Sequence, residues 1–420
     1  MLRTANAAGP AELLRLKREY LLPCVYHFYK DPPQIVGGRG CRLIDHAGRE
    51  YIDCYSGVTV MSAGHCNPEI IEPAIEQIRT LQHTTSIYLT EPVLRLAEKL
   101  AQITPGGLKR SFFCASGSDA VEGALLLASL HSRRAEVVAF SGGLHGRTRW
   151  AMNATGLDMW RTDPFPFPDI HHVPFSDAAA IESVLQSRGD HIAAVIGEPI
   201  QGNGGINVPD RDFWPRVRRI CDRYGVLLIL DEVQTGFGRT GEWFGCEHWG
   251  VTPDIMVLSK AMGNGFPIAA FITTDAIASS YTRPGASTYG GNPVCAAAAL
   301  ATIEFHTSHD LKGSAAARGE QLRDGLRNLA ARHPSMLAEP RGLGLMLGLP
   351  CVDRSGRADA STCDLILESL KQHGVLAGKT GAERNVLTLM PPLVMEEDDV
   401  SAVVEALGDV LAACETTHRG

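Results

Sequence analysis

Short apolar runs alternate with helix-like stretches through the middle of the chain, and this alternation restricts the possible folds more than any other feature. The apolar runs are EVVAFSG, IAAVIGEP, VLLILDE and DIMVLSK, each about as long as an ordinary strand. Helix-like segments such as EPVLRLAEKLAQI and SDAVEGALLLASLHSR lie among them, with a further strand-like run, KRSFFCA. Fully apolar strands separated by helices are typical of a mostly parallel sheet that helices cover on both faces. The sequence therefore predicts an α/β fold.

The two ends of the chain show different patterns. Near the amino end, QIVGGRGCRLIDHAGREYIDCYSG alternates apolar and polar residues around glycine turns, which predicts antiparallel strands. The first 23 residues suggest a short amphipathic helix. After about residue 306 we expect a long polar helix, the strand GLGLMLGLP, a helix, the strand NVLTLMPP and a last helix. We therefore predict a large domain over residues 61–306, and a smaller α+β domain that combines residues 307–420 with residues 1–60.

Composition excludes several classes of protein. The net charge is -8 and no long basic run is present, which argues against binding to nucleic acid. No window approaches the roughly 18 apolar residues of a membrane span. The eleven cysteines are scattered without the spacing of a metal site or a disulfide framework, and the amino end does not resemble a secretory signal. We therefore expect reduced thiols, a cytoplasmic location and no bound metal.

Chemically suggestive residues follow the apolar runs, where ligands of parallel sheets bind. FFCASGSDA places Ser116, Gly117 and Ser118 at the start of a helix, where free backbone amides and the helix dipole could hold a phosphate. The same residues would also serve as an ordinary helix cap. LLILDEVQ supplies Asp231 and DIMVLSKAMGNG supplies Lys260, although one lysine after a strand is more often a surface residue.

Together these features match the requirements of pyridoxal phosphate. A lysine is needed to bind the aldehyde of the cofactor covalently, and a carboxylate is needed to keep the pyridine nitrogen protonated. Lys260 and Asp231 are the candidates for these two roles. Val233 lies two residues beyond Asp231, so in an extended stretch it would face the same way and could press on the ring. The protonated pyridine nitrogen would therefore supply the positive charge that Asp231, at the end of an apolar run, needs as a partner.

The chain also resembles a known family over nearly its whole length. The motifs that carry the resemblance are GHCNP, SGSDAVEGAL, HGRT, GEPIQGNGG, LDEVQTGFGRTGEWFGCEHWGVTPDIMVLSKAMGNGFPIAA and STYGGNPVCAAAAL. They resemble the class III (ω-type) aminotransferases, which are pyridoxal phosphate enzymes of fold type I with a seven-stranded, mostly parallel sheet in the large domain. VTVMSAGHCNP and LQHTTSIYL look closest to the alanine–glyoxylate aminotransferase branch, which also contains lyases of phosphorylated amines.

The resemblance implies a role for each matching residue. Lys260 and Asp231 are implied as the catalytic pair. The implied cofactor-binding residues are Gly117, Ser118, Leu144, His145, Gln201, Asp231, Val233, Lys260 and Thr288. Thr288, in STYGGN, is expected to reach the cofactor phosphate of a neighbouring subunit, which implies a homodimer with shared active sites. The implied substrate residues are Phe28, Val58, Asn203 and Thr388.

Three positions depart from the family pattern. Leu144 stands where an aromatic residue usually stacks on the ring. Thr388, in NVLTLMPPL, replaces the usual carboxylate-binding arginine, and Asn203 replaces a glutamate that often partners that arginine. Losing both charges together is coherent, because a buried glutamate without its arginine would be unpaired. The remaining candidates for binding a substrate anion are Arg147, Arg149, Arg161 and Arg384.

These departures leave two functions open. The family resemblance favours an aminotransferase that moves an amino group from a primary amine or ω-amino acid to a small keto acid. The alternative is an ammonia-lyase or phospholyase that acts on an amino-alkyl phosphonate or phosphate, such as 1-hydroxy-2-aminoethylphosphonate. A decarboxylase, a racemase or a non-catalytic relative is less expected, because both Lys260 and Asp231 are present. A nicotinamide-dependent dehydrogenase is disfavoured, because no Gly-x-Gly-x-x-Gly turn follows the first strand.

Overall fold

The large domain is built on one seven-stranded sheet, as the sequence predicts. The computed structural model describes residues 8–167 and 169–417. Along the sheet the strands follow the order β4 (Arg110–Cys114), β10 (Ala269–Thr273), β9 (Ile255–Leu258), β8 (Leu227–Asp231), β7 (Ile192–Gly197), β5 (Glu136–Phe140) and β6 (Ile170–Val173). Only β10 runs antiparallel to its neighbours, and the other pairs are parallel. The predicted α/β class is confirmed.

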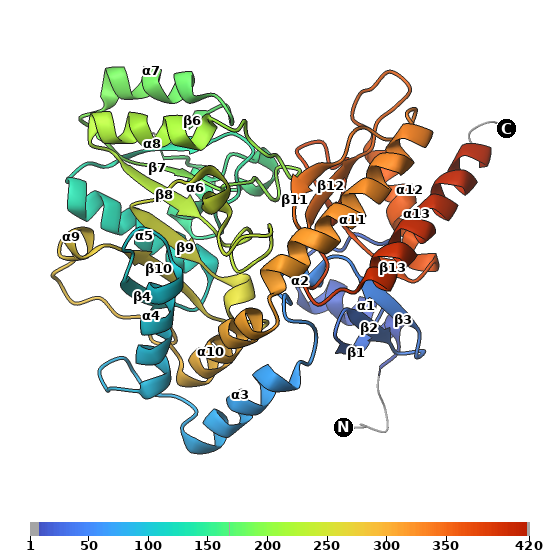
Figure 1. Ribbon diagram of the computed structural model, residues 1–420, viewed down its shortest axis with the longest axis horizontal. Coiled ribbons are helices and arrows are strands. Elements are labelled where there is room, and N and C mark those ends of the chain that lie inside the picture. Colours follow the sequence, from blue (N-terminus) through green and yellow to red (C-terminus); the bar gives the residue numbers. More distant parts are fainter. Residues whose placement is uncertain (1–7, 168, 418–420) are drawn as a thin grey trace.

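Helices cover both faces of this sheet because its strands are apolar on both sides. In β8, Leu228 and Leu230 pack into one core cluster and Ile229 packs into the other. The second of these clusters contains residues of α5 (Gly117–Ser132), α6 (Arg149–Ala154) and α9 (Asp275–Ala278). The first contains residues of α4 (Glu91–Ile103), α7 (Ala178–Arg188), α8 (Phe213–Tyr224) and α10 (Pro293–Ser308). Figure 1 shows the resulting layers.

The smaller part of the molecule contains two four-stranded sheets. The first has the order β1 (Ile35–Arg39), β2 (Arg42–Asp45), β3 (Glu50–Asp53) and β13 (Val375–Leu376). The second has the order β11 (Arg341–Leu343), β12 (Met346–Pro350), β15 (Val386–Leu389) and β14 (Gly378–Thr380). The helices α11 (Leu311–Arg332), α12 (Ala360–Gln372) and α13 (Glu397–Thr417) pack with these sheets in one hydrophobic cluster.

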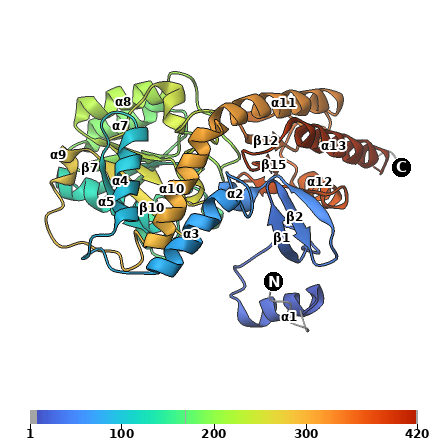
Figure 2. The same cartoon turned by 60° about the horizontal axis from the view of Figure 1, so that its bottom comes forward.

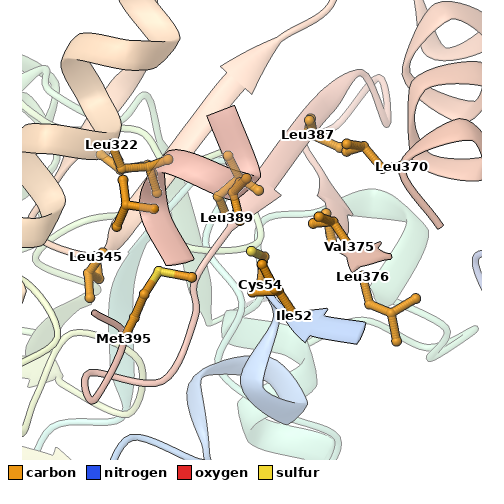
Figure 3. Packing of buried hydrophobic residues seen from close by; sticks show 14 of the residues in the cluster. Ile52, Cys54, Leu322, Leu345, Leu370, Val375, Leu376, Leu387, Leu389 and Met395 are labelled. Atoms are coloured by element: carbon orange, nitrogen blue, oxygen red, sulfur yellow. The ribbon is translucent and has the colours of Figure 1, made fainter. Parts of the chain in front are cut away.

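The two ends of the chain meet in this cluster. Strand β13 pairs in parallel with β3, with Val375 opposite Ile52. Figure 3 shows Ile52 and Cys54 among the side chains of Leu376 and Leu389. The segment after β3 contains α2 (Ser56–Thr59) and α3 (Pro68–Thr80), and α3 lies along α10 of the large domain. The domain boundaries at residues 60 and 306 stay a prediction.

Some elements differ from the sequence expectation or extend it. GLGLMLGLP forms the hairpin β11–β12 rather than one strand, because Gly344 turns the chain at a φ of 53°. Strands β6 and β10 were not expected; IHHV carries two histidines, and β10 departs from the parallel pattern. The helix α1 (Pro10–Tyr20) forms within the predicted amphipathic segment, has no buried residue and stands apart from the body (Figure 2); residues 1–7 lie outside the described part.

Candidate functional site

Asp231 is the last residue of strand β8 and Glu232 follows it directly, and the carboxylates of these two residues have different partners. Asp231 is only 3% exposed; its Oδ2 accepts a hydrogen bond from His145 Nδ1 at 2.8 Å, and its Oδ1 accepts from the Val233 amide at 3.1 Å. Glu232 is fully buried and accepts from the backbone amides of Gly245 and Cys246, both at 2.8 Å. Glu232 therefore fixes the following loop, whereas Asp231 belongs to the site.

His145 connects Asp231 to the wall of the site. Its backbone amide donates to Thr155 Oγ1 at 3.0 Å, which holds the loop that carries the ring. Burial lowers the pKa of the imidazole, but the hydrogen bond and charge of Asp231 outweigh that effect and raise the pKa overall. Among the described residues, His145 Nε2 is buried without a hydrogen-bond partner. The imidazole thus holds the Asp231 carboxylate through Nδ1.

Glu198 is a site residue that the sequence analysis did not identify. It follows β7, and its carboxyl oxygens accept hydrogen bonds from the Leu144 amide at 2.9 Å and the Gly202 amide at 3.0 Å. Burial raises the pKa of Glu198 to about 7, and the negative charge of Asp231 adds to the shift. The available signal was the glutamate of IAAVIGEP, which ends a buried strand just as Asp231 does.

Lys260 follows β9 and begins the short 3-10 helix η3 (Lys260–Met262). Its φ of 45° is in the left-handed region, an unfavourable conformation for a lysine and one that is typical of functional sites. Burial lowers the pKa of Lys260 to about 8, although the charges of Asp231 and Glu198 oppose this shift. The amine is therefore easier to deprotonate than that of an exposed lysine.

The start of α5 lies against the ends of β8 and β9. A Cβ atom placed on Gly117 would lie 3.4 Å from Val233 Cγ1 and 3.6 Å from Ser259 Cβ. Ser116 caps the helix, with its Oγ accepting from the Asp119 amide at 3.3 Å. Ser118 Oγ instead accepts from the Arg147 amide at 2.9 Å. The predicted phosphate residues therefore adjoin the residues after both strands, and Gly117 leaves room beside Val233.

These residues fit the cofactor that the sequence implies. A half-buried lysine with a lowered pKa, a buried carboxylate and the glycine-containing start of a 16-residue helix meet at one edge of the sheet. Free amides at such a helix start suit a phosphate. The residues that would hold the group are Lys260, Asp231, Val233, Gly117 and Ser118. Their individual roles stay predictions. No group of three or more His, Cys, Asp or Glu residues that could hold a metal occurs within the described ranges.

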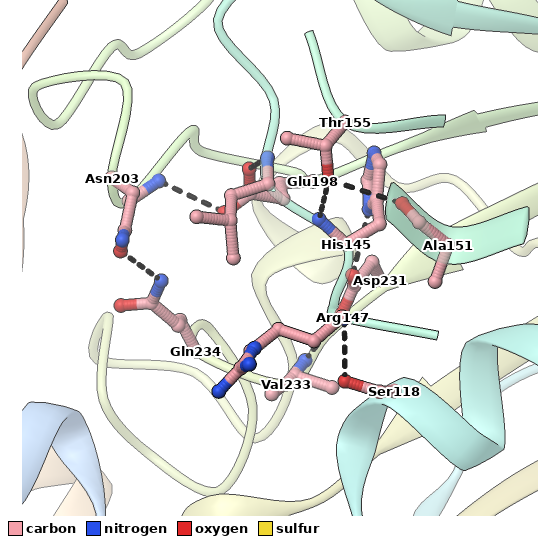
Figure 4. A network of polar contacts seen from close by, with 12 residues as sticks. Ser118, His145, Arg147, Ala151, Thr155, Glu198, Asn203, Asp231, Val233 and Gln234 are labelled. Carbon is pink, nitrogen blue, oxygen red and sulfur yellow. Dashed lines mark hydrogen bonds and ion pairs between the residues drawn. The ribbon is translucent and has the colours of Figure 1, made fainter. Parts of the chain in front are cut away.

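Gln201 and Asn203 line the loop after β7. Gln201 is buried; its Nε2 donates to the Ser141 carbonyl at 2.8 Å and its Oε1 accepts from Asn207 Nδ2 at 3.0 Å. Asn203 Oδ1 accepts from Gln234 Nε2 at 3.0 Å. Figure 4 shows Asn203 and Gln234 facing each other on one side of the Asp231 region. Both predicted residues are therefore held by neighbouring side chains, while the role of Gln201 toward the cofactor stays a prediction.

Thr388 is fully buried on β15 and does not present a free hydroxyl. Its Oγ1 lies 2.8 Å from Thr380 Oγ1 and 3.1 Å from the Val386 carbonyl oxygen. Gly348 and Gly378 flank it on the neighbouring strands, and the Tyr55 ring occupies the space above Gly378. The Asn203 carbonyl accepts from the Gly381 amide at 3.0 Å, so the two altered positions lie near each other.

Phe28 and Val58, the other predicted substrate residues, come from the segments around β1–β3. Phe28 is half-buried and packs edge-on against Tyr55, with ring centroids 5.6 Å apart. Val58 is half-buried in α2 at a φ of 67°. Thr288 is exposed on the loop between α9 and α10. The single chain does not bring Thr288 into the hydrogen-bonded network around Asp231 drawn in Figure 4.

The four arginines that are candidates for binding a substrate anion differ in the partners of their guanidinium groups. Arg149 pairs with Asp163 at 2.7 Å and Arg161 pairs with Asp158 at 2.7 Å. The Arg384 guanidinium lies 5.5 Å from the centre of the Tyr26 ring. Arg147 is exposed, and its side chain forms no ion pair with any described residue. In Figure 4 the Arg147 side chain extends on the side of Gln234 and Asn203.

The chain is similar to known proteins over most of its length. A family model described as "Aminotransferase class-III" matches residues 29–411. The chain is 37% identical over 418 residues to alanine–glyoxylate aminotransferase 2 homolog 2, mitochondrial, of Arabidopsis thaliana, which covers 95% of this chain and 87% of that protein. It is 40% identical over 382 residues to a putrescine aminotransferase of Pectobacterium atrosepticum, covering 88% and 80% respectively. The ornithine aminotransferase of Toxoplasma gondii superposes with a TM-score of 0.90 at 28% identity, covering 98% of this chain and 97% of that structure.

Proposed function

The chain belongs to the class III aminotransferases, which depend on pyridoxal phosphate, and from that premise we propose that it moves the amino group of a primary amine or ω-amino acid to a small keto acid. When bound, the cofactor supplies an aldehyde for the amine and a ring that withdraws electrons from the amine-bearing carbon. The observation that carries the proposal is the convergence of Lys260, Asp231 and Gly117 at one edge of the sheet.

The residues of this edge have complementary tasks. Lys260 would hold the cofactor aldehyde, and its Nζ would accept the proton from the amine-bearing carbon of the substrate, which the lowered pKa of about 8 favours. Asp231 keeps a proton on the ring nitrogen, and the hydrogen bond from His145 Nδ1 at 2.8 Å fixes the carboxylate for that role. The amides at the start of α5 hold the phosphate.

Arg147 is our candidate for binding the anionic group of the amine or of the keto acid. Its guanidinium has no carboxylate partner among the described residues, and its backbone amide is anchored to Ser118 at 2.9 Å. Thr388 and Asn203 are uncharged, so neither of these two positions offers a positive charge to a second carboxylate. This arrangement supports an amine without an α-carboxylate. The similarity to a putrescine aminotransferase supports the same class of substrate.

The uncharged Thr388 also favours the second candidate, a lyase. An ammonia-lyase or phospholyase needs only one substrate, so it does not require a site for a keto acid. Lys260 Nζ would take the proton from the amine-bearing carbon of an amino-alkyl phosphonate or phosphate, and a β-hydroxyl or β-phosphate would leave with the electron pair. The enamine so formed, once released, would add water and give an aldehyde and ammonia. Arg147 would then bind the phosphonate or phosphate.

A panel of amines with and without keto acid tests the proposal. The purified protein is loaded with cofactor and given amines with and without an α-carboxylate, together with pyruvate or glyoxylate. An aminotransferase should stop after one equivalent without the keto acid and resume when it is added. Sustained ammonia release from a β-hydroxy or β-phospho amine without a keto acid would replace the first candidate by the second. Rapid use of glutamate would contradict the preference for amines without an α-carboxylate.

We further propose that the active unit is a homodimer located in the cytoplasm. A cavity of about 310 Å³ is lined by nine residues between Thr84 and Ala97, by Ser111–Phe113, and by Gly285, Ser287 and other residues of the loop that carries Thr288. The neighbouring side chains of Ile87, Tyr88, Leu89 and Tyr289 are 66–88% exposed, more apolar surface than a lone chain usually leaves open. The free state of all eleven cysteines supports the location. In the part of the chain that is described, no helix is long and apolar enough to cross a membrane.

A further inference from the structure

The segment after β3 contains a turn in a strained conformation. Ser56, Gly57, Val58 and Thr59 have φ angles of 46°, 61°, 67° and 60°, so four successive residues are left-handed. This conformation is unfavourable for every residue except glycine, and most of all for the β-branched Val58 and Thr59. Strain of this kind persists only where the surrounding structure fixes the chain. We therefore searched for the contacts that fix the turn.

The amino-terminal half of the turn is held from the small domain. Asp53 Oδ1 accepts from the amides of Tyr55 at 2.9 Å and Ser56 at 2.8 Å. Ser56 Oγ donates to the Met390 carbonyl at 2.7 Å. The Val58 and Thr59 amides both donate to the Tyr55 carbonyl, at 2.9 and 3.1 Å. These bonds shape the turn, but none of them connects it to Lys260.

Asn264 makes that connection from the large domain. It lies four residues after Lys260, is 5% exposed and has a φ of 42°. Its Oδ1 accepts from the Ala63 amide at 3.0 Å, and its Nδ2 donates to the Gly64 carbonyl at 3.1 Å. One side chain therefore uses both ends of its amide on consecutive residues of the segment that follows the turn.

The two loops also pack closely. A Cβ atom placed on Gly265 would lie 3.1 Å from Met61 Sδ, so the loop after Lys260 touches the segment between the turn and Ala63. Asn67 Nδ2 donates to the Ala63 carbonyl at 2.9 Å and so holds the peptide group that lies between the two groups bound by Asn264. These contacts set the position of the turn relative to Lys260. Among the described residues of the lysine loop, Asn264 is the one whose side chain donates or accepts hydrogen bonds to the segment that follows the turn.

We propose that Asn264 is a positioning residue that fixes the turn Ser56–Thr59 against the lysine loop, and that it thereby determines how large a substituent the substrate can carry beside its amine. The size limit rests on the proposed function and on the role of Val58 as a substrate residue, which the family resemblance implies. The alternative is that the Asn264 hydrogen bonds stabilise the fold without affecting the choice of substrate.

Two variants and a control separate these roles. Asn264→Gly removes both hydrogen bonds and accepts the left-handed backbone without strain. Asn264→Asp keeps the acceptor for the Ala63 amide but loses the donor to the Gly64 carbonyl. The control is Thr104→Val, which removes a buried hydroxyl that lies 2.8 Å from the Leu100 carbonyl and 3.0 Å from the Leu108 carbonyl, outside the site described above. Hydrogen exchange and substrate selectivity are measured for all three.

In Asn264→Gly we expect the amides of residues 55–64 to exchange at least about tenfold faster than in the parent, while those of β8 do not change. The ratio of kcat/KM for a bulky amine to that for a small one should rise at least about fivefold, mainly through KM. Asn264→Asp should show an intermediate effect, and Thr104→Val should change neither quantity. Unchanged exchange at residues 55–64, or an unchanged ratio, would overturn the proposal. If the parent releases ammonia instead of transferring an amino group, the ratio is measured for that reaction.

Discussion

Glu198 and Asp231 are both buried carboxyl groups at strand ends, but their hydrogen bonds differ. Asp231 receives an imidazole N–H at 2.8 Å, whereas Glu198 receives only the amides of Leu144 and Gly202. Because burial raises the pKa of Glu198 to about 7, the folded protein binds more protons there than the unfolded chain between about pH 4.5 and 7. The free energy of unfolding therefore falls as the pH rises through this window.

Replacement of Glu198 tests this pH dependence. In cofactor-free protein, Glu198→Gln should remove a decrease in stability of up to about 3 kcal/mol between pH 4.5 and 7. The variant loses one accepted hydrogen bond, so it can be less stable at low pH while its pH slope becomes shallower. Urea unfolding at a series of pH values measures the slope. If the free energy of unfolding changes with pH in the same way for parent and variant, the pKa of Glu198 is not raised by folding.

Asp231→Asn should leave a folded protein that binds the cofactor but is slower by several orders of magnitude. The amide preserves the shape of the carboxylate but cannot keep the ring nitrogen protonated, and it also exchanges an acceptor for a donor opposite His145. Steady-state kinetics at saturating cofactor measure the loss. A rate within about tenfold of the parent corresponds to only ~1.4 kcal/mol of barrier and would exclude this role.

Lys260→Ala should abolish turnover and the yellow colour that the resting protein gains on binding the cofactor covalently. The left-handed backbone at Lys260 and its pKa of about 8 both indicate that this lysine is placed for chemistry rather than for solubility. Borohydride reduction followed by peptide mapping identifies the modified lysine in the parent protein. Modification of another lysine, or normal activity of the variant, would contradict the assignment.

At the scale of single elements, the residues that surround Thr388 on β15 determine what an arginine at this position would contact. Thr388 is 0% exposed, its hydroxyl is bonded, and the Tyr55 ring lies above the neighbouring Gly378. Thr388→Arg alone should therefore bury an unpaired guanidinium and lower the free energy of unfolding by about 3 kcal/mol or more. Adding Asn203→Glu should recover part of this loss, because the two positions lie near each other through Gly381.

The double variant should also shift selectivity toward glutamate or 2-oxoglutarate. A charge-assisted bond to a carboxylate contributes roughly 1.5–3 kcal/mol, or about 10- to 150-fold in kcat/KM. Denaturant unfolding and kinetics on both classes of substrate are measured for the single and double variants. Equal stability of the two variants would show that the residues at positions 203 and 388 do not interact.

Helices and strands could be predicted from the sequence where the local pattern of apolar residues matches the faces that the fold buries. Helix α4 has the bounds that its apolar periodicity predicts, and β8 ends at Asp231 as expected. The hairpin β11–β12 was read as one strand because a turn made by Gly344 leaves the apolar run unbroken. The site was predictable where chemistry follows a strand, as at Lys260. The burial of Thr388 was not predictable from the sequence. It depends on Gly378 and on the ring of Tyr55, and neither residue belongs to a recognisable motif.

At the scale of the whole molecule, the proposed sharing of the phosphate site between two chains predicts a dimer. Thr288 is exposed and lies on the rim of an apolar surface that includes Leu89, which is 88% exposed. If a second chain covers that surface, Thr288 can reach the phosphate bound at α5 of its neighbour. Gel filtration should then give a dimer, and Leu89→Asp should weaken the dimer and reduce the activity of dilute protein. Full activity of a monomer would contradict shared sites.

Mixed dimers provide the sharper test of sharing. Thr288→Ala should weaken cofactor binding by about 10- to 150-fold, the value of one hydrogen bond to a charged group, without dissociating the dimer. In a dimer of one Lys260→Ala chain and one Thr288→Ala chain, one site would contain both defects, while the other would combine an intact Lys260 with an intact Thr288. At a cofactor concentration that leaves Thr288→Ala largely unloaded, mixing the two nearly inactive proteins should therefore restore activity, because each hybrid dimer gains one complete site. If Thr288 instead served the site of its own chain, both sites of the hybrid would carry one defect, and mixing would restore nothing.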